Sequence, residues 1–366
     1  MKVMIFANSG AGLYKFRKEL LEELLKLYEV EICLPNGAYV EEMSDMGCKF
    51  IACDLLERRG KNPLKDFELF KFYRKVLKQS KPDVVLTYTI KPNVYGGMAC
   101  GMAKIPYIAN ITGLGTAVEN PGVMQKVTLI LYKLGLMRAQ KVFFQNEENR
   151  KFMLKFGIAK DKHDLLPGSG VNLNQYQLFD YPTSDTIDFV FVARVMKEKG
   201  IDNYLDAAKY IKEKYPQTRF HVCGGCDEKY SGILEKLHNE GVIIYHGVVK
   251  NMAEMYKKAS CIIHPSYYPE GLSNVLLESS ASGRAIITTN RPGCGEVIDD
   301  GINGFVCKQK DSEDLIKQIE KFLLLSWEDR KAMGLAGRKK VEKSFNRKIV
   351  IDKYLNEINK SKASLK

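Results

Sequence analysis

The sequence predicts an α/β protein with two parallel β-sheets, each covered by helices on both faces. Short apolar runs alternate with amphipathic segments along the whole chain, which is typical of repeated β-α-β units. This alternation is interrupted once, over residues 168–186, which are rich in Gly, Asn, Gln, Pro, Ser and Tyr. A chain of 366 residues is long enough for two domains of ordinary size, so we expect a linker at the interruption.

The segment before the interruption contains six apolar runs of strand length. We expect strands at Val3–Ala7, Val30–Leu34, Phe50–Cys53, Val84–Thr87, Tyr107–Asn110 and Val142–Gln145. The amphipathic segments between them predict helices, among them Tyr14–Leu27, Leu64–Gln79, Asn93–Ala103 and Met124–Met137. Because helices join consecutive strands, the sheet should be parallel.

The same pattern restarts after the interruption. We expect strands at Ile187–Ala193, Arg219–Cys223, Ile243–His246, Cys261–His264 and Ala285–Thr288. Helices are predicted at Asp202–Lys214, Tyr230–Asn239, Asn251–Lys257 and Ser312–Leu324. These elements define a Rossmann-like domain at 1–170, a second at 171–345 and a C-terminal helix at 346–366 that could pack back on the first domain. Ligands of such sheets bind at the carboxyl ends of the strands, so two domains facing each other across a cleft would suit two substrates.

The composition excludes several classes of protein. Nine Cys residues without framework spacing indicate reduced thiols and a cytosolic location. The apolar run that begins after Lys2 ends at Ala7, which is too short for a secretion signal. No run reaches the roughly 20 apolar residues of a membrane-spanning helix. No nucleic-acid-binding motif accompanies the net charge of +12, so we expect no nucleic-acid partner.

Basic residues are most concentrated in residues 58–81, where they alternate with Leu, Phe and Tyr. Two interpretations of this basic amphipathic segment remain open. It is either a solvated helix face whose aromatic side packs on the core, or a surface that rests on anionic lipid headgroups. The second interpretation would make the protein peripheral on the inner face of the cell membrane.

Two loops of the second domain carry groups that suit a nucleotide. Arg194 ends a predicted strand and Lys199 precedes a predicted helix, so the two cations lie on one loop and can grip a diphosphate. Gly224 begins a small-residue loop after the next strand, which we expect near the nucleoside. The alternative for the first loop is a charged surface turn.

The stretch Tyr268 to Ser279 is the most informative feature of the chain. It places Glu270 in a Gly-containing turn and Glu278 inside the apolar helix that follows. A strand–turn–helix junction exposes backbone N–H groups and the positive end of a helix dipole, so it favours an anionic ligand. The carboxylates could hold hydroxyl groups of a sugar or ribose.

Loops after the first-domain strands supply further candidates. Gly10 and Gly12 follow the first strand, where small residues allow a phosphate to approach the backbone. Candidates for the acceptor side are Lys91, Asn93, Thr112, Gly113 and Asn146. Asn146 could instead cap the helix that follows it. The chain contains no Asp-x-Asp, no P-loop and no Gly-x-Ser-x-Gly motif, so we expect no metal clamp, no cofactor and no serine nucleophile.

These features together resemble a retaining glycosyltransferase of the GT-B fold, family 4. The resemblance rests on the tandem α/β units, on Ala193 to Gly200 and on the spacing of Glu270 and Glu278. The stretches Thr89–Asn93 and Thr112–Gly115 are similar to those of bacterial enzymes that build capsule, O-antigen or other glycans on a polyprenyl diphosphate.

The resemblance implies a role for each candidate. Arg194 and Lys199 would neutralise the diphosphate leaving group, Glu278 would bind the ribose, and Glu270 would lie beside the donor sugar. Backbone N–H groups for the donor would come from Gly271, Leu272, Ser273 and Asn274. Many relatives carry a first-domain histidine near the donor sugar, whereas the first histidine here is His163. The enzyme would then do without that group or use Thr112 or a neighbour.

The sequence therefore predicts metal-independent transfer of a hexose or N-acetylhexosamine, with retention, from a UDP-sugar to a polyprenyl-diphosphate-linked glycan. Three alternatives remain open at this point. They are a nucleotide-sugar 2-epimerase of the same fold, a nicotinamide-dependent oxidoreductase and a basic nucleic-acid-binding protein. The oxidoreductase is disfavoured because the glycine spacing of a dinucleotide fingerprint is absent.

Overall fold

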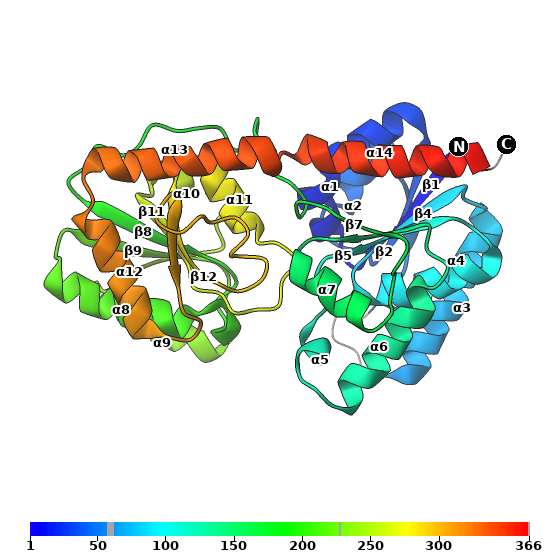
Figure 1. Cartoon of the computed structure of the whole chain (residues 1–366), viewed down its shortest axis with the longest axis horizontal. Coiled ribbons are helices and arrows are strands. Elements are labelled where there is room, and N and C mark those ends of the chain that lie inside the picture. Colours follow the sequence, from blue (N-terminus) through cyan, green and yellow to red (C-terminus); the bar gives the residue numbers. More distant parts are fainter. Residues whose placement is uncertain (57–61, 227, 365–366) are drawn as a thin grey trace. The chain divides into compact units, whose positions relative to one another are not determined.

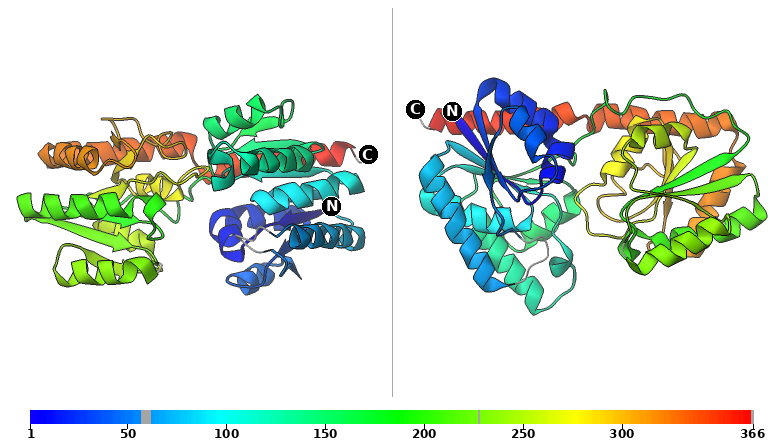
Figure 2. Two further views of the ribbon diagram at one scale, coloured as in Figure 1. Left: turned by 90° about the horizontal axis from the view of Figure 1, so that it is seen from below. Right: turned by 180° about the vertical axis from the view of Figure 1, so that it is seen from behind.

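A computed structural model describes residues 1–56, 62–226 and 228–364 as two compact α/β units (Figure 1). Unit 1 comprises Met1–Ser169, Pro269–Leu272 and the chain from Lys348 onward, and unit 2 comprises Gly170–Tyr268 and Ser273–Arg347. Each unit contains one parallel sheet between two layers of helices (Figure 2). This confirms the α/β prediction with two parallel sheets.

The sheet of unit 1 has seven strands in the order β3-β2-β1-β4-β5-β6-β7, and every neighbouring pair is parallel. The strands are β1 (Lys2–Phe6), β2 (Glu29–Leu34), β3 (Lys49–Ala52), β4 (Val84–Tyr88), β5 (Tyr107–Ile111), β6 (Lys141–Phe144) and β7 (His163–Leu165). The six predicted strands are confirmed to within three residues at each end. The sequence analysis missed β7, because a three-residue edge strand that reads His-Asp-Leu has no apolar run.

The helices of unit 1 follow the strands in alternation. They are α1 (Gly10–Leu27), α2 (Val40–Asp45), α3 (Pro63–Ser80), the π-helical turn η1 (Pro92–Gly96), α4 (Gly97–Ala103), α5 (Thr116–Glu119), α6 (Val123–Leu136) and α7 (Glu147–Lys155). Local chemistry sets the bounds of α3. Asn62 caps its start by accepting from the Leu64 N–H at 2.9 Å, Pro63 occupies the first turn, and Lys81 ends it in the left-handed region.

Two hydrophobic cores lie on opposite faces of this sheet. Side chains of α3, α4 and α6 fill one core, and side chains of α1, α2 and the last helix, α14 (Arg347–Ser364), fill the other. From α14, the side chains Val350, Ile351, Tyr354 and Ile358 are buried there. The red helix in Figure 1 is therefore an integral part of unit 1 from Lys348 onward.

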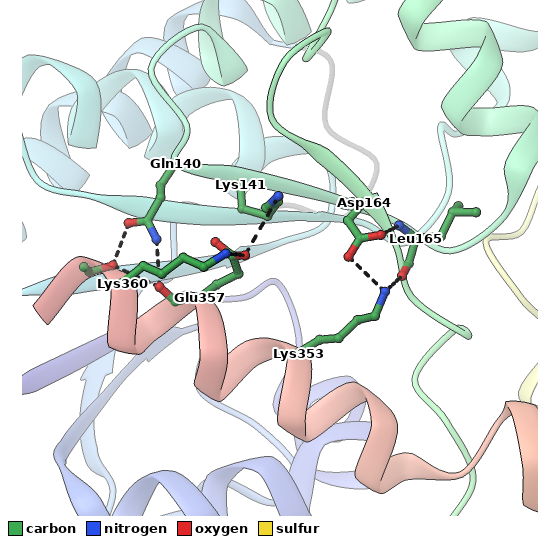
Figure 3. A network of polar contacts seen from close by, with 8 residues as sticks. Gln140, Lys141, Asp164, Leu165, Lys353, Glu357 and Lys360 are labelled. Carbon is green, nitrogen blue, oxygen red and sulfur yellow. Dashed lines mark hydrogen bonds and ion pairs between the residues drawn. The ribbon is translucent and has the colours of Figure 1, made fainter. Parts of the chain in front are cut away.

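Polar contacts fix α14 against the edge of the sheet (Figure 3). Lys353 donates to the Asp164 carboxylate at 2.9 Å and to the Leu165 carbonyl at 2.7 Å, which ties the helix to β7. Gln140 donates to the Glu357 carbonyl at 2.7 Å. The strand missed in the sequence is thus one of the elements that hold the C-terminal helix.

The sheet of unit 2 has six parallel strands in the order β10-β9-β8-β11-β12-β13. They are β8 (Ile187–Val192), β9 (Thr218–Cys223), β10 (Ile244–Gly247), β11 (Cys261–His264), β12 (Ala285–Thr289) and β13 (Gly304–Cys307). The five predicted strands are confirmed, and β13 was missed because only four residues follow a Gly-rich turn. The strands β8, β11 and β12 are buried throughout, as expected for the centre of a parallel sheet.

The helical segments of unit 2 also alternate with strands. They are the 3₁₀ turn η2 (Lys197–Lys199), α8 (Ile201–Lys214), α9 (Glu228–Asn239), α10 (Met252–Lys258), α11 (Asn274–Ala281), α12 (Ser312–Leu324) and α13 (Trp327–Ser344). The core on one face is supplied by α8, α9 and α12. Along the other face lie α10, α11 and α13 (Figure 1). No helix in the described part of the chain is long and apolar enough to cross a bilayer.

A charged cluster on β8 and β9 is expected to make the stability of unit 2 depend on pH. The buried Asp188 accepts two hydrogen bonds from Arg219, at 2.7 and 2.8 Å, and one contact at 2.8 Å from a His221 ring nitrogen. Burial alone would raise the pKa of Asp188, but His221 and Arg219 outweigh burial and hold that pKa below its ordinary value of 3.8.

We expect Asp188→Asn to destabilise unit 2 at pH 7 by about 1.5–3 kcal/mol, the usual contribution of hydrogen bonds to a charged group. A lowered carboxyl pKa stabilises the fold above the unfolded-state value of about 4, and this contribution is lost as pH falls through the folded-state pKa. Urea unfolding at pH 7, 5 and 3 should therefore show the variant and wild type converging at low pH. The control is Glu235→Gln on the exposed face of α9. A constant difference between the two proteins at all three pH values would contradict this account.

Candidate active site

Arg194 lies on the exposed loop that follows β8, at the carboxyl end of the sheet of unit 2. This loop packs backbone to backbone on the loop that follows β9. The Val195 N–H donates to the Gly225 carbonyl at 2.9 Å, and a Cβ atom at Gly224 would lie 1.7 Å from the Ala193 carbonyl oxygen. The structure thus brings the Arg194 loop and the Gly224 loop together, and only glycine fits at position 224.

Lys199 ends the short turn η2 at the far end of the same loop. Gly200 follows with a φ of 76°, and a Cβ atom there would lie 2.2 Å from the Pro265 carbonyl oxygen. The Lys199 ammonium nitrogen lies 5.2 Å from the ring centroid of Tyr268. The loop is therefore packed on the segment that follows β11, and the Lys199 cation is held beside it.

Contacts of Ser273 with His264 on β11 and with Gly293 after β12 hold the start of α11. Ser273 occupies the cap position, but its hydroxyl contacts the His264 ring at 3.2 Å and does not cap the helix. The Ser273 N–H donates to the Gly293 carbonyl at 2.8 Å. No Ser273 side-chain bond caps this helix, and the positive end of its dipole favours an anion.

Glu278 lies one turn further along α11 and is half-buried. It accepts a hydrogen bond of 3.0 Å from the hydroxyl of Tyr256 on α10. Burial, with a smaller effect of Glu278, raises the pKa of Tyr256 well above its ordinary value, so Tyr256 remains a donor. The buried Arg284 in turn donates to the Tyr256 carbonyl at 2.7 Å. A chain of contacts from Arg284 through Tyr256 therefore positions the Glu278 carboxylate.

Glu270 belongs to unit 1, because Pro269–Leu272 packs on the carboxyl ends of β5 and β6. Asn146 holds this segment by donating to the Glu270 carbonyl at 3.1 Å and to the Gly271 carbonyl at 2.6 Å. The same side chain caps α7 by accepting from the Asn149 N–H at 2.8 Å. Asn146 is thus a helix cap, as the alternative interpretation held, and it also anchors the turn that carries Glu270.

Two glycines allow the segment Pro269–Leu272 to pack closely on the loops that follow β5 and β6 in unit 1. A Cβ atom at Gly271 would lie 2.4 Å from the Gln145 side-chain oxygen and 2.5 Å from the Thr112 carbonyl oxygen. Gly113 has a φ of 148°, and a Cβ atom there would lie 3.3 Å from the Pro269 carbonyl oxygen. The candidates Thr112, Gly113, Asn146 and Gly271 therefore meet at one place in the structure.

The first glycine loop is shorter than the sequence indicated. Helix α1 begins at Gly10, four residues before the predicted start, so Gly10 and Gly12 lie in its first turn. Ser9 caps this helix by accepting from the Gly12 N–H at 3.3 Å. A Cβ atom at Gly10 would lie 2.4 Å from the Ala38 carbonyl oxygen, so packing on Ala38 requires glycine at this position.

Comparisons with known proteins agree with this arrangement. Residues 2–146 match the family model described as Glycosyl transferase 4-like, and residues 179–340 match the one described as Glycosyl transferases group 1. The fold matches that of Anabaena HepE, crystallised with UDP and glucose, with a TM-score of 0.79 at 16% identity over 99% of this chain and 100% of that chain.

The chain is a GT-B glycosyltransferase.

Two curated relatives of this glycosyltransferase are informative. It is 28% identical to the N,N′-diacetylbacillosaminyl-diphospho-undecaprenol alpha-1,3-N-acetylgalactosaminyltransferase of Campylobacter jejuni, over 97% of each chain. It is 22% identical to the UDP-Gal:alpha-D-GlcNAc-diphosphoundecaprenol alpha-1,3-galactosyltransferase of Escherichia coli, over 79% of this chain and 78% of that one. Both relatives are named as transferases, and both family models describe glycosyl transferases. The predicted glycosyltransferase activity is therefore confirmed, and the epimerase alternative is not supported.

Two acceptor-side candidates of the glycosyltransferase are engaged in internal contacts. Asn93 is buried, accepts from the Thr87 hydroxyl at 2.6 Å and donates to the Asn110 carbonyl at 2.8 Å. Lys91 forms an ion pair with Asp66 at 2.7 Å. These contacts fix the segment between β4 and α4, which includes η1.

Three residues that position the site were missed in the sequence. Arg284, Tyr256 and His264 carry no motif, and the sequence does not show which residues they contact, so only the fold reveals them. Arg284 could have attracted notice as a lone cation that follows Gly283 directly before a buried strand. Within the described ranges no group of three His, Cys, Asp or Glu side chains is arranged to hold a metal ion.

Substitution of Asn146 tests the anchor of the Glu270 turn. Asn146→Ala should destabilise the glycosyltransferase by about 1–3 kcal/mol, through loss of a helix cap and of buried hydrogen bonds. The matched variant Asn146→Asp keeps the capping oxygen but removes the donor to the Gly271 carbonyl. Thermal unfolding should rank wild type above both variants. Equal stability of wild type and Asn146→Asp would show that the two bonds to the turn contribute nothing.

Proposed function

We propose that this glycosyltransferase moves a hexose or N-acetylhexosamine from a UDP-sugar to a glycan carried on a polyprenyl diphosphate, in bacterial surface polysaccharide or glycan biosynthesis. The observation that carries the proposal is the relative from Campylobacter jejuni, which aligns over 97% of both chains and whose name specifies a diphospho-undecaprenol acceptor. The relative from Escherichia coli is named for a UDP-sugar donor and an acceptor of the same class. Such an enzyme would work in the cytoplasm, peripheral to the inner face of the membrane.

The proposed donor roles concern residues of unit 2, and the local geometry supports them. Arg194 and Lys199 bind the diphosphate, and the positive end of the α11 dipole, at Ser273 and Asn274, adds to their potential. Glu278, oriented by Tyr256, accepts hydrogen bonds from the ribose hydroxyls. The Gly224 loop packs on the Arg194 loop and contacts the nucleoside.

The proposed roles in unit 1 concern the sugar and the acceptor. Glu270 lies on the turn with Gly271 and Leu272, and it contacts the donor sugar. Gly10 and Gly12 admit a phosphate to the start of α1, and Thr112 and Gly113 lie beside the Glu270 turn on the acceptor side.

In this proposal the enzyme accelerates transfer by stabilising the negative charge that develops on the departing diphosphate. Breaking the bond between sugar and phosphate builds negative charge on the diphosphate, and two fixed cations with helix dipoles stabilise it without a metal ion. The departing phosphate takes the acceptor proton on the same face of the sugar, so the anomeric configuration is retained and no protein nucleophile is needed.

A direct assay tests substrate, stereochemistry and metal dependence together. The enzyme is incubated with a panel of UDP-, GDP- and ADP-sugars and a short-chain polyprenyl-diphosphate glycan, with and without EDTA. We expect transfer from a UDP-sugar, a product with the donor's anomeric configuration by NMR, and a rate unchanged by EDTA. Epimerised free sugar, or transfer that does not depend on the lipid-linked acceptor, would contradict the proposal.

A further inference from the structure

A basic groove with a volume of about 730 Å³ lies on unit 1 between α3 and α4. Five of the residues that line it are cations, namely Lys71, Arg74, Lys75, Lys78 and Lys81. Apolar side chains line the rest, including Leu77, Ala99 and Met102. No Asp or Glu is among the lining residues. This groove falls in the described part of the basic segment 58–81, whose residues 58–61 lie outside the described ranges.

Among the residues that the structure describes, the charges of the five cations are not neutralised by ion pairs. Across residues 1–56, 62–226 and 228–364, none of them forms an ion pair. Lys71 lies 4.5 Å from the ring centroid of Phe67, and Arg74 lies 5.9 Å from that of Phe70. Lys91, by contrast, is paired with Asp66. Five like charges around one groove repel each other, so an anion placed in the groove is stabilised.

The position of the groove separates it from the reaction. Its lining includes Pro82, which leads into β4, and Ile105, which leads into β5, so it lies at the amino edge of the sheet. The Glu270 turn and the start of α1 lie at the carboxyl edge. The five residues of β4 separate the two edges by about 16 Å, at roughly 3.3 Å per residue. The groove is therefore remote from the candidate active-site residues of unit 1.

An exposed apolar stripe runs along α6, on the same face of the sheet. Its residues recur at intervals of four and three, which aligns them on one helix face, and they are Val123, Val127, Ile130, Leu134 and Met137. Between 46% and 79% of each residue is exposed. The opposite side of α6 is buried in the core through Leu129, Tyr132 and Leu136.

Helix α4 connects the stripe to the groove. Arg138, just after α6, donates to the Gly101 carbonyl on α4 at 2.7 Å. Met102 on α4 is 57% exposed and also lines the groove. The helices α3, α4 and α6 form one layer in unit 1 (Figure 1). A cationic groove and an apolar helix are thus parts of one continuous surface.

We infer that this surface docks on a bilayer, with the groove holding the phosphate headgroup of an anionic phospholipid and the α6 stripe buried among the acyl chains. The inference rests on the proposed function, because an acceptor on a polyprenyl diphosphate is confined to a membrane. Cations beside an exposed apolar helix match the two components of such a surface. A second copy of the chain would bring the same five cations into contact, and a nucleic acid would leave the apolar stripe uncovered. At about 21 Å, α6 is too short to span a bilayer and lies in its plane.

Vesicle co-sedimentation of the full chain tests this inference. Vesicles contain phosphatidylcholine alone or with phosphatidylglycerol. We expect wild type to bind the mixed vesicles at least tenfold more tightly, and this preference to weaken at high salt. Two variants address the surface: a groove variant, with Lys75, Lys78 and Lys81 each changed to Gln, and a stripe variant, with Val127→Ser and Ile130→Ser. Each should lose at least tenfold in affinity for the mixed vesicles.

Matched controls keep the inference falsifiable. A unit 2 variant with Lys209, Lys257 and Lys317 each changed to Gln removes the same charge from exposed positions and should bind as wild type does. Circular dichroism of each variant should match that of wild type and so show that the variant is folded. Wild-type binding by the groove variant would overturn the inference. So would a dimer of wild type, seen by sedimentation velocity, that the stripe variant abolishes, because the stripe would then be an interface between copies.

An activity measurement separates this inference from the proposed function. Transfer to a water-soluble short-chain acceptor should be the same for wild type and both surface variants. If wild type uses no polyprenyl-linked acceptor but still binds anionic vesicles through the groove, only the proposed function fails. If transfer proceeds as expected and the groove variant binds vesicles normally, only the docking surface fails.

Discussion

Replacing Arg194 or Lys199 by Ala is expected to lower kcat about 10²–10³-fold, equivalent to about 2.7–4 kcal/mol of transition-state stabilisation. The diphosphate gains charge as the sugar departs, so a cation fixed beside it stabilises the transition state more than the bound donor. The affinity for UDP should fall less than kcat does, because part of each contact is made only in the transition state. Single-turnover transfer rates and UDP titrations measure the two effects separately.

Lys197 provides the control for this pair. It lies on the same loop and is exposed, but it is the first residue of η2 rather than the last. Lys197→Ala should therefore stay within about twofold of wild type, as is usual for exposed side chains away from a site. Equal losses in all three variants would point to a general effect of loop charge. Normal turnover in both Arg194→Ala and Lys199→Ala would remove the assignment of these residues to the diphosphate.

The second large effect is expected at Arg284, which is completely buried. Its guanidinium donates to five backbone carbonyls, those of Phe179, Asp180, Tyr256, Lys257 and Gly283, and lies 5.7 Å from the ring centroid of Tyr181. Burial lowers the pKa of Arg284 to about 10. Arg284→Met removes these donors and leaves buried acceptors unsatisfied, which should destabilise unit 2 by at least about 3 kcal/mol. Urea unfolding can be followed by the fluorescence of Trp327, the only tryptophan of the chain, which lies in unit 2.

Arg284 should also affect the site without touching a ligand. Since it holds the backbone of Tyr256, and the Tyr256 hydroxyl orients Glu278, a destabilised Arg284→Met should bind UDP more weakly even where it remains folded. Arg284→Lys retains the charge but not the planar set of donors, so it should be intermediate in stability. Lys257→Met, at an exposed neighbouring position, is the control and should change stability by less than about 0.5 kcal/mol. A stable Arg284→Met with wild-type UDP affinity would show that the chain of contacts is unimportant.

The fold was largely predictable because a parallel sheet buried on both faces needs continuous apolar strands, such as Val3–Ala7 and Cys261–His264. The elements that were missed or misjudged have weak hydrophobic patterns in the sequence. The edge strand β7 is polar, the last strand β13 is short, and the helix expected at Asn93–Ala103 divides into a π-helical turn and α4. Gly10 opens α1 despite its low helix propensity, because packing on Ala38 requires a residue without a side chain.

The sequence predicted only those site residues that lie on loops directly after predicted strands. Arg194, Lys199 and Gly224 lie on loops after strands, so their proximity within unit 2 could be inferred from the rule for parallel sheets. The supports of Glu278 and Ser273 could not be inferred, because Arg284, Tyr256 and His264 act through contacts between different elements of unit 2 that no motif marks. Nor does the sequence show that Pro269–Leu272 belongs with the ends of β5 and β6, since this depends on the carbonyl contacts of Asn146.

The place of α14 in the core of unit 1 has a consequence for biosynthesis. The ribosome releases β1 to β7 early, yet Val350, Ile351, Tyr354 and Ile358, which complete one of their two cores, are translated nearly two hundred residues later. One apolar face of the nascent amino-terminal half therefore stays exposed while unit 2 is synthesised. We expect chaperones to bind the nascent chain during that interval.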